Sequence, residues 1–352
     1  MFQSLPLFVL VIIFIAGTVA VWIAGVQLSN TTDVMSSRFG FGEALGGLLF
    51  LAIATNLPEI AITAAAALSH NIGIAIGNIL GGIGIQTVVL VVLDICGLWR
   101  KDALTYKAAS LELVLEGVLV VATLIIAIMS TQLPKSLIFA RLAPGDLLIA
   151  CVWLVGVWLI SKARTGLPWQ EKRGAPDSDD TDKESESQSK IEKWSTARVI
   201  TVFVIASLVT LVAGAVLEES GNVIADHIGL SGVLFGATAL AVVTSLPELS
   251  TGLASVKIKD YDLAVSDIFG GNAFLPVLFL EATLLSGQSA LPQAKNSDIY
   301  LASLGILLTT VYVYGLIFRP RRQILNMGID SLIVLVLYLV GIVGLFAIAR
   351  GS

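Results

Sequence analysis

The stretch Thr244-Ser245-Leu246-Pro247-Glu248 places a carboxylate directly after a proline, inside an apolar run from Leu234 to Leu253. A run of this length and composition otherwise predicts a membrane-spanning helix. A charge at bilayer depth costs at least about 2.5 to 3.5 kcal/mol on insertion scales, so residues of this kind usually have a function. Glu248 is therefore the first candidate functional residue of the chain.

A near copy of this stretch, Thr55-Asn56-Leu57-Pro58-Glu59, lies at a constant offset of 189 residues upstream. The surrounding residues match at the same offset without a gap, and a Gly-Gly pair follows each motif at the same separation. Chance similarity between apolar segments would not reproduce both features, so the chain is predicted to contain two copies of one unit. The other matched pairs are Gly25 and Gly214, Gly40 and Gly229, Gly47 and Gly236, Ala52 and Ala241, Ala75 and Ala264, Gly81 and Gly270, and Gly82 and Gly271.

The composition is that of a membrane protein. Of the 352 residues, 56% are hydrophobic and 13% charged, with a mean hydropathy of +0.90, whereas about a quarter of the residues of a soluble domain are charged. The small net charge of -5 gives no reason to expect a nucleic-acid partner. We therefore predict an all-α polytopic membrane protein whose partners are the lipid bilayer and inorganic cations. Ten segments are long enough to cross the bilayer, at about 5–28, 41–68, 72–98, 104–130, 145–163, 197–218, 230–256, 261–286, 297–318 and 328–349.

An acidic segment divides these ten helices into two groups of five. Residues 166–194 are polar and cannot bury a core, which predicts a disordered linker between a first repeat at 1–165 and a second at 195–352. A weak regulatory cation site or a phosphorylated segment is the alternative for this linker. Because each group crosses the membrane an odd number of times, the second must enter from the opposite side. Inverted repeats are typical of secondary transporters, whose sites lie near the midplane.

Basic residues predict the orientation. Of the 21 Lys and Arg residues, 17 fall on the side of the linker, which places the linker in the cytoplasm and both termini outside. The first apolar run, 5–26, has no basic n-region and no small-residue cleavage motif, so it is predicted to be a retained helix. We expect a multi-pass protein of the cell membrane that acts as a monomer.

The repeated motif provides oxygen atoms at membrane depth. Proline has no N–H, so Pro58 and Pro247 are expected to kink their helices and free the carbonyls of Ala54 and Val243. Hydroxyl, amide and carboxylate oxygens stand beside those carbonyls, which suits Ca²⁺, Na⁺ or Mg²⁺ better than Zn²⁺ or Cu⁺. These side chains are Thr55, Asn56 and Glu59 in the first copy and Thr244, Ser245 and Glu248 in the second.

The alternative is a purely structural role for the motif. In that case the proline only kinks the helix, the hydroxyls donate to the freed carbonyls, and each Glu pairs with a base. No Lys or Arg lies within an apolar segment near either motif, so a bound cation or a proton is expected to neutralise Glu59 and Glu248. Further polar groups follow at membrane depth, and Asp267 is the third acid that we assign to the site. The others are Asn78, Gln86 and Asn272, while Asp94 and Glu281 lie where they could reach an interface, and Glu43, Glu112, Glu116, Asp146 and Asp330 are expected as snorkelling or cap residues.

These features resemble the two alpha repeats of the Ca²⁺/cation antiporter superfamily, particularly its Na⁺/Ca²⁺ exchanger branch. The likeness covers the whole topology and is specific at 52–86 and 241–275, where Ile76-Gly77-Asn78 and Val265-Ser266-Asp267 follow the Pro-Glu pairs. The resemblance implies that Glu59 and Glu248 are the central Ca²⁺ and Na⁺ ligands, and that the first and sixth helices slide across the other helices. It further implies oxygen ligands from Thr55, Asn56, Thr244 and Ser245, and outer Na⁺ sites at the carbonyls of Ala52 and Ala241.

The chain departs from the pattern of that superfamily at several ligand positions. The usual Gly-Ser-Asn is replaced by Gly81-Gly82-Ile83 and Gly270-Gly271-Asn272, which removes both ligand serines. Gln86 and Leu275 stand where Asn or Asp is typical, and Asp267 adds a carboxylate at a position that is usually Asn. We therefore identify the chain as a divergent member.

The function predicted from the sequence is a secondary antiporter that exports Ca²⁺ in exchange for Na⁺ by alternating access. A proton-coupled exchanger, or one for another cation, is the nearest alternative, and a cation channel or a non-transporting scaffold is the next. An enzyme is not expected, because no nucleophile and base pair, HExxH motif or phosphate loop occurs. No cofactor is expected beyond the transported Ca²⁺ and Na⁺ or H⁺.

Overall fold

The chain folds into a bundle of membrane-length helices. The computed structural model describes residues 2–39, 53, 56–97, 102–108, 110–163, 194–257 and 259–351. Within these ranges nine helices are long and apolar enough to cross a membrane, and Leu57–Leu68 is a shorter apolar helix. The prediction of an all-α polytopic fold is confirmed. The first half of the predicted segment 41–68 and nearly all of the predicted linker lie outside the described residues.

The first repeat contains α1 (Leu7–Phe39), α3 (Leu57–Leu68), α4 (Ile72–Gly97), α5 (Leu104–Lys107), α6 (Leu111–Ser130) and α7 (Pro144–Ala163). The second contains α9 (Thr196–Ile228), α10 (Gly232–Phe235), a π-helical turn (Gly236–Leu240), α11 (Ala241–Thr244), α12 (Leu246–Lys257), α13 (Tyr261–Phe274), α14 (Leu278–Ser286), α15 (Asn296–Phe318) and α16 (Ile329–Gly351). The described part of the chain also contains two 3₁₀ turns, Leu275–Val277 and Leu291–Gln293, and a two-stranded hairpin of β1 (Gln323–Ile324) and β2 (Met327–Gly328).

Three helices differ from their predicted spans. Both α1 and α9 contain 33 residues and run past the predicted ends at 28 and 218, because polar side chains near those ends are buried rather than solvated. Glu218 is 1% exposed and accepts a hydrogen bond of 3.2 Å from the side-chain amide of Asn71. The predicted segment 104–130 is interrupted, since the Ser110 hydroxyl caps α6 by accepting the N–H of Leu113.

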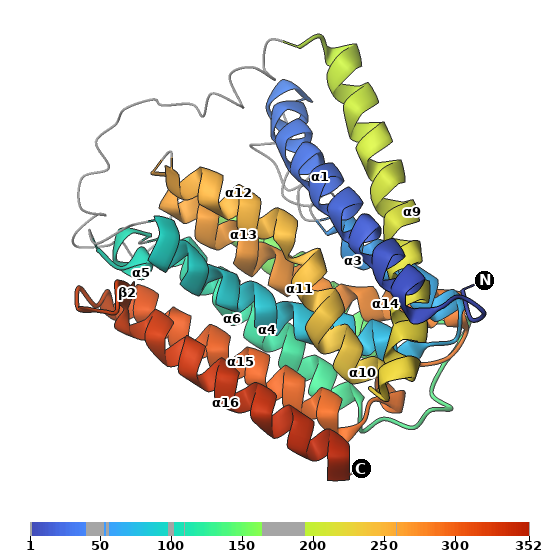
Figure 1. The fold of residues 1–352 in the computed structure, drawn as a ribbon. Helices are drawn as coiled ribbons and strands as arrows, with labels where there is room; N and C mark the ends of the chain where they lie inside the picture. The colour runs from blue at the N-terminus through green and yellow to red at the C-terminus, as the bar shows by residue number, and fades with distance from the viewer. Residues whose placement is uncertain are drawn as a thin grey trace.

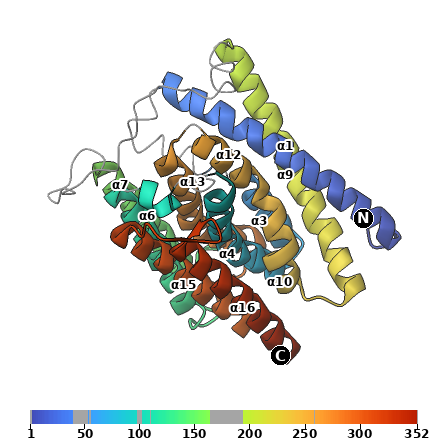
Figure 2. The same ribbon diagram turned by 60° about the vertical axis from the view of Figure 1, so that its left-hand side comes forward.

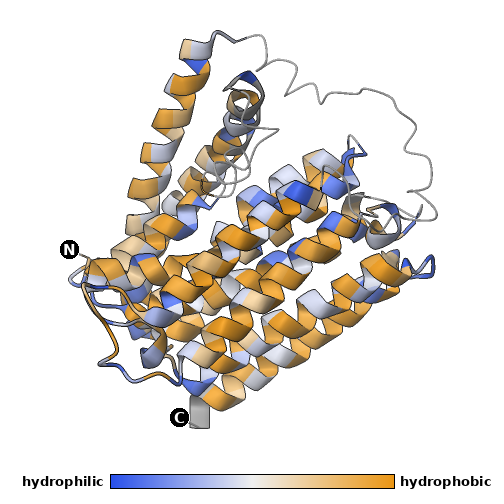
Figure 3. Ribbon diagram, turned by 180° about the vertical axis from the view of Figure 1, so that it is seen from behind, coloured by the Kyte–Doolittle hydropathy of each residue, from blue (hydrophilic) through white to orange (hydrophobic). Residues whose placement is uncertain are grey.

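The helices fall into two groups. α1 and α9 pack along one another as a pair on the outside of the bundle, and α4, α6, α12, α13, α15 and α16 form the main body (Figure 1). In the turned view the pair crosses the remaining helices at a clear angle (Figure 2), and in Figure 1 it stands apart from α12 near the linker end. Apolar residues run along the membrane-length helices (Figure 3), and many large apolar side chains are exposed, as a lipid-facing surface requires.

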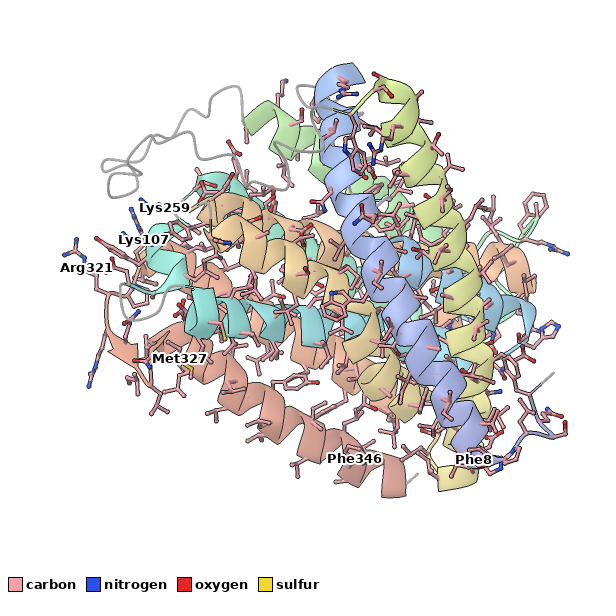
Figure 4. All side chains as sticks on the ribbon, turned by 45° about the horizontal axis from the view of Figure 1, so that its top comes forward. Phe8, Lys107, Lys259, Arg321, Met327 and Phe346 are labelled. Carbon is pink, nitrogen blue, oxygen red and sulfur yellow. The ribbon has the colours of Figure 1, made fainter. Side chains whose placement is uncertain are left out.

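Both termini lie at the end of the bundle opposite α5 and the β-hairpin (Figure 1). Phe8 and Phe346 mark the end that holds the termini, and Lys107, Lys259 and Arg321 mark the other end (Figure 4). An odd number of crossings in each repeat explains why both termini share one end. The first repeat then begins on one side and ends on the other, and the second repeat returns the chain to the first side. The end that gathers these basic residues is the one predicted to face the cytoplasm.

The two repeats pack across one another at the proline motifs. A Cβ atom on Gly25 of α1 would lie 2.4 Å from the Pro247 ring, and a Cβ atom on Gly214 of α9 would lie 2.5 Å from the Cβ of Ala61, one turn after Pro58. Gly25 and Gly214 are repeat mates, as are Pro58 and Pro247. Each outer helix therefore touches the motif of the other repeat at a distance that only glycine permits.

At the end predicted to face the cytoplasm, a buried carboxylate ties three chain segments together. Asp94, near the end of α4, is 0% exposed and accepts the N–H groups of Leu104 (2.8 Å) and Gly328 (2.6 Å). Asp330 at the start of α16 is also buried and accepts the hydroxyl of Thr105. Asp94 and Asp330 thus hold α5 and the β-hairpin against the helix ends.

Candidate cation site

The proline of the second motif breaks its helix as predicted. α11 ends at Thr244 and α12 begins at Leu246. The Ser245 and Thr244 hydroxyls donate to the Ala241 carbonyl at 2.7 and 3.3 Å, and the Ser245 N–H reaches the same carbonyl at 3.2 Å. In this conformation the Ala241 oxygen, which the family resemblance implies as a Na⁺ ligand, is thus held by its own helix. The hydroxyl lone pairs of both side chains stay available to a cation.

In the first motif, α3 begins at Leu57 with Pro58 in its first turn and Asn56 immediately before it. Pro in the first turn of a helix removes no hydrogen bond of that helix. Glu59 follows in the same first turn, as Glu248 does in α12. Thr55 and Ala52, two predicted ligands, lie outside the described residues.

The two glutamates face one another inside the bundle. Glu59 is 0% exposed and Glu248 is 4% exposed. Glu59 interacts with the Thr244 hydroxyl of the opposite motif, and Glu248 interacts electrostatically with Glu59. The two copies of the motif, far apart in sequence, therefore meet at one place, which is the arrangement that the sequence predicts.

No base compensates these charges in the part of the chain that the structure describes. The ion pair found there joins Lys107 to Asp102, far from both glutamates along the chain. Within the same part, Oε2 of Glu59 and both carboxylate oxygens of Glu248 have no hydrogen-bond partner. Buried carboxylates without a partner are strongly unfavourable, so the site is suited to a bound cation or to protons.

Neutral side chains complete one wall of the site. The Gln86 amide of α4 donates a hydrogen bond of 3.3 Å to Oε1 of Glu59. Gly271 of α13 lies against this amide and against Asn56, since a Cβ built on it would lie 3.5 Å from Gln86 Oε1 and from Asn56 Nδ2. The glycine that replaces the ligand serine of the resembled superfamily thus leaves room for two amide side chains, both of which carry oxygen ligands.

Asp267 joins the site from α13. Its carboxylate accepts a hydrogen bond of 2.8 Å from the Thr251 hydroxyl and interacts electrostatically with Glu248. The predicted third acid is therefore adjacent to the central pair. Thr251 was not predicted as a site residue, although its position three residues after Glu248 places it on the same side of α12.

A second amide lies where the two repeats meet. Asn272 of α13 is 0% exposed and donates to the Thr87 hydroxyl at 3.2 Å and to the Ile83 carbonyl at 3.5 Å. Ile83 and Asn272 are repeat mates, 189 residues apart. Repeat mates that touch must lie near the axis that relates the repeats, so this contact places both residues at the pseudo-two-fold axis. Thr87, which Asn272 also contacts, directly follows Gln86 in the sequence.

Two further residues, Asn78 and Leu275, make no hydrogen bond to the glutamates within the described residues. Asn78 is 0% exposed, and its backbone lies close to Gly236 of the π-helical turn; within the described residues no hydrogen bond links it to either glutamate. Leu275 is 0% exposed, packs in the hydrophobic core and touches the Gly82 position at 3.3 Å. The expectation that Leu275 provides no ligand agrees with this packing.

The acids assigned to helix ends are more deeply placed than expected. Glu116 is 5% exposed and accepts the Ser266 hydroxyl at 2.8 Å, while Asp146 and Asp330 are 1% and 4% exposed. They are thus not snorkelling side chains. Asp94, which the sequence allowed to reach a membrane interface, is instead the buried carboxylate that accepts the N–H groups of Leu104 and Gly328.

Comparison with known proteins agrees with this architecture. The profile of the family described as Sodium/calcium exchanger protein matches residues 9–161 and 198–347. The inner membrane protein YrbG of Escherichia coli (strain K12) is 27% identical over 328 residues, which cover 91% of this chain and 92% of YrbG.

Two solved structures share the fold. The H⁺/Ca²⁺ exchanger CAX superposes with a TM-score of 0.71 at 15% identity, over 96% of this chain and 82% of CAX. The sodium-calcium exchanger NCX_Mj superposes with a TM-score of 0.58 at 16% identity, over 96% of this chain and 99% of that protein. Together with two inverted proline and glutamate motifs that converge inside the bundle, the match over both repeats establishes that this chain belongs to the sodium/calcium exchanger family of membrane cation transporters.

Proposed function

We propose that this protein exports Ca²⁺ in exchange for Na⁺ by alternating access, with Glu59 and Glu248 as the central ligands. The observation that carries the proposal is the meeting of these two carboxylates, both buried, with three of their four oxygens lacking a hydrogen-bond partner in the described part of the chain. A dianionic site neutralised by one Ca²⁺ or by Na⁺ ions can cross a closed state, whereas the empty site is held back by the desolvation cost of its charges.

The neutral oxygens favour Na⁺ as the coupling ion. Na⁺ needs a shell of oxygen ligands, which the hydroxyl of Thr244, the carbonyl oxygen of Gln86 and the amide of Asn56 can provide beside the carboxylates. A proton needs a carboxylate alone. The alternative of proton coupling is favoured by one observation: Leu275 brings no ligand where its repeat mate Gln86 brings an amide, so fewer oxygens compete with a proton for the glutamates.

The paired outer helices supply the moving element of this proposal. α1 and α9 stand apart from α12 and α13 near the linker end and approach the bundle at the other end in the view of Figure 1. The Glu218 and Asn71 contact joins α9 to the turn between α3 and α4 at that approached end. A slide of the pair across the two proline motifs would close one side and open the other. We further propose that both termini face outside and the linker faces the cytoplasm.

The deciding experiment is Ca²⁺ uptake into proteoliposomes under an imposed Na⁺ gradient and, separately, under a pH gradient. We expect uptake with the Na⁺ gradient, and its loss in Glu59→Gln and Glu248→Gln. Asp226→Asn is the matched control, because Asp226 is an exposed acid outside the site. Uptake driven only by the pH gradient would establish proton coupling instead, and uptake that needs neither gradient would exclude antiport. Unchanged transport by both glutamine variants would exclude this ligand assignment.

A further inference from the structure

The second repeat carries a polar pair that the first repeat lacks. Asp267 and Thr251 are joined by a hydrogen bond of 2.8 Å, and their repeat mates are Asn78 and Ile62. The first copy thus has an uncharged amide and an apolar side chain at the two corresponding places. Both mates are 0% exposed. The carboxylate and hydroxyl are therefore not required by the fold that the two repeats share.

The pair lies directly beside the central site. The Thr251 hydroxyl is 2.8 Å from Asp267 Oδ2 and 3.1 Å from the backbone carbonyl oxygen of Glu248. A hydroxyl has a single proton, so the Thr251 hydroxyl can donate to only one of these two oxygens at a time. The other oxygen then has a lone pair that the hydroxyl does not use. The Glu248 side chain, 4% exposed, interacts electrostatically with both Glu59 and Asp267, and neither of its oxygens has a hydrogen-bond partner among the described residues. This buried carboxylate thus has two anionic neighbours.

The pair occupies its own side of Glu248. Along α12, Thr251 lies about one turn from Glu248 toward Lys257, and Asp267 is in the second turn of α13. Both are thus displaced from Glu248 toward the turn that connects α12 and α13, whereas Glu59 approaches from α3. Asp267 is partly exposed. A cation held here would be next to the ion at the glutamate pair without replacing it.

Charge balance decides what this place would bind. One Ca²⁺ neutralises Glu59 and Glu248 and leaves the charge of the partly exposed Asp267 without a counter-ion next to a buried anionic site. The oxygens at hand are one carboxylate, one hydroxyl and one backbone carbonyl, which are too few for the six to eight ligands that Ca²⁺ takes. A monovalent cation balances the remaining charge, and Na⁺ accepts such a mixed set of oxygens.

We infer that Asp267, Thr251 and the Glu248 carbonyl form a second cation site that holds one Na⁺ while Ca²⁺ occupies the glutamate pair. The inference rests on the proposed function, since it assigns Ca²⁺ to Glu59 and Glu248. It adds one Na⁺ that binds together with Ca²⁺ rather than in competition with it. The site exists in one repeat only, so it makes the two halves of the transporter unequal.

The test is equilibrium binding of radioactive Na⁺ and Ca²⁺ to the purified full-length protein in detergent. At saturating Ca²⁺ we expect the wild type to retain one bound Na⁺ per chain. Asp267→Asn, which installs the residue of the repeat mate, should lose that Na⁺ but still bind one Ca²⁺ per chain at saturating Ca²⁺, with an affinity lowered only by the loss of a neighbouring negative charge. Thr251→Val should weaken the same Na⁺ by about tenfold, the cost of one ligand. Thermal melting of each variant confirms that it is folded.

Three outcomes would overturn the inference. One is a wild type that holds no Na⁺ when Ca²⁺ is saturating, and another is Asp267→Asn that holds as much Na⁺ as the wild type. The third is an Asp267→Asn protein that loses Ca²⁺ as completely as Glu248→Gln, which would make Asp267 a central ligand. Failure of the proposed function appears differently: the wild type would then bind no Ca²⁺, whether or not an Asp267-dependent Na⁺ is measured.

Discussion

Gln86 of α4 donates its side-chain amide hydrogen to Oε1 of Glu59 at 3.3 Å, and this bond joins the helix that follows the first motif to the motif itself. The repeat mate of Gln86 is Leu275, which is buried in the core and makes no such bond to Glu248 in the described structure. One glutamate is thus oriented by an amide, whereas neither oxygen of the other has a hydrogen-bond partner among the described residues.

Gln86→Leu gives the first repeat the leucine that the second repeat has at the matching position, Leu275. It removes both the hydrogen bond to Glu59 and an oxygen ligand, so we expect the Ca²⁺ affinity to fall about tenfold, the value of one hydrogen bond to a charged group. The measurement is the Ca²⁺ dependence of transport in proteoliposomes. Leu275→Gln is the reciprocal variant: it adds an amide beside the Gly82 position without changing Gln86, and should leave the bond between Gln86 and Glu59 intact. An unchanged affinity in Gln86→Leu would mean that the amide does not orient Glu59.

Removal of a central carboxylate should stabilise the cation-free protein. The folded site buries Glu59 and Glu248 close together, so without a cation Glu59→Gln removes one carboxylate that must otherwise stay charged or take up a proton there. We expect a higher melting temperature in chelator at neutral pH, and loss of the stabilisation by Ca²⁺, which is about 2.7 kcal/mol at 100 times Kd for a specific ligand. Differential scanning fluorimetry with and without Ca²⁺ checks both. A variant that melts lower in chelator and still responds to Ca²⁺ would contradict the site.

Gly25 and Gly214 should be sensitive to a single methyl group. A Cβ at either position would come within 2.4 or 2.5 Å of the opposite proline motif, so Gly25→Ala and Gly214→Ala must displace α1 or α9. We expect each to lower the transport rate by about tenfold or more, while Ca²⁺ binding in detergent changes little. Gly73→Ala is the control, because its Cβ would meet Val233 at an ordinary 3.5 Å. Equal rates in all three variants would show that the outer helices do not pass the motifs closely.

Asp94 should contribute stability rather than transport. Asp94→Ala leaves the N–H groups of Leu104 and Gly328 without their acceptor, at a cost of about 1 to 3 kcal/mol for each buried group. Unfolding in a denaturing detergent should begin at a lower concentration, with Ca²⁺ affinity retained. Asp102→Ala, which breaks the partly exposed ion pair with Lys107, is the control and should cost less than about 1 kcal/mol. Equal losses in both variants would contradict the clamp.

Much of the fold was predictable because the membrane limits the choices. Segment length gave the spans, and the repeat offset gave the meeting of Glu59 with Glu248, since matched motifs in inverted halves face each other across the axis. The ends of α1 and α9 were less predictable. Burial of Glu218 against Asn71 lets α9 continue past its apolar part, and such a contact between distant segments leaves no local pattern.

The carboxylates and the neutral residues of the motifs that the structure brings together were named from the sequence, but two threonines beside them, Thr251 and Thr87, were not. A carboxylate in an apolar run is conspicuous, which is why Asp267 was recognised, but a threonine or an asparagine is common in membrane helices. Thr251 and Thr87 gain importance only from the helices that lie opposite them, Thr251 through Asp267 and Thr87 through Asn272. The break at Ser110 likewise depends on a cap whose strength competes with helix continuation.

The contact between the Asn272 amide and the Ile83 carbonyl has a consequence for how two equal halves become one transporter. At the axis each residue meets its own counterpart, so two identical copies would place the same side chain on both sides of the contact. Two isoleucines would leave the Thr87 hydroxyl and the Ile83 carbonyl without the Asn272 amide. The two Pro-Glu pairs are alike, whereas the residues at the axis differ, and this difference supplies the amide that joins the two halves there.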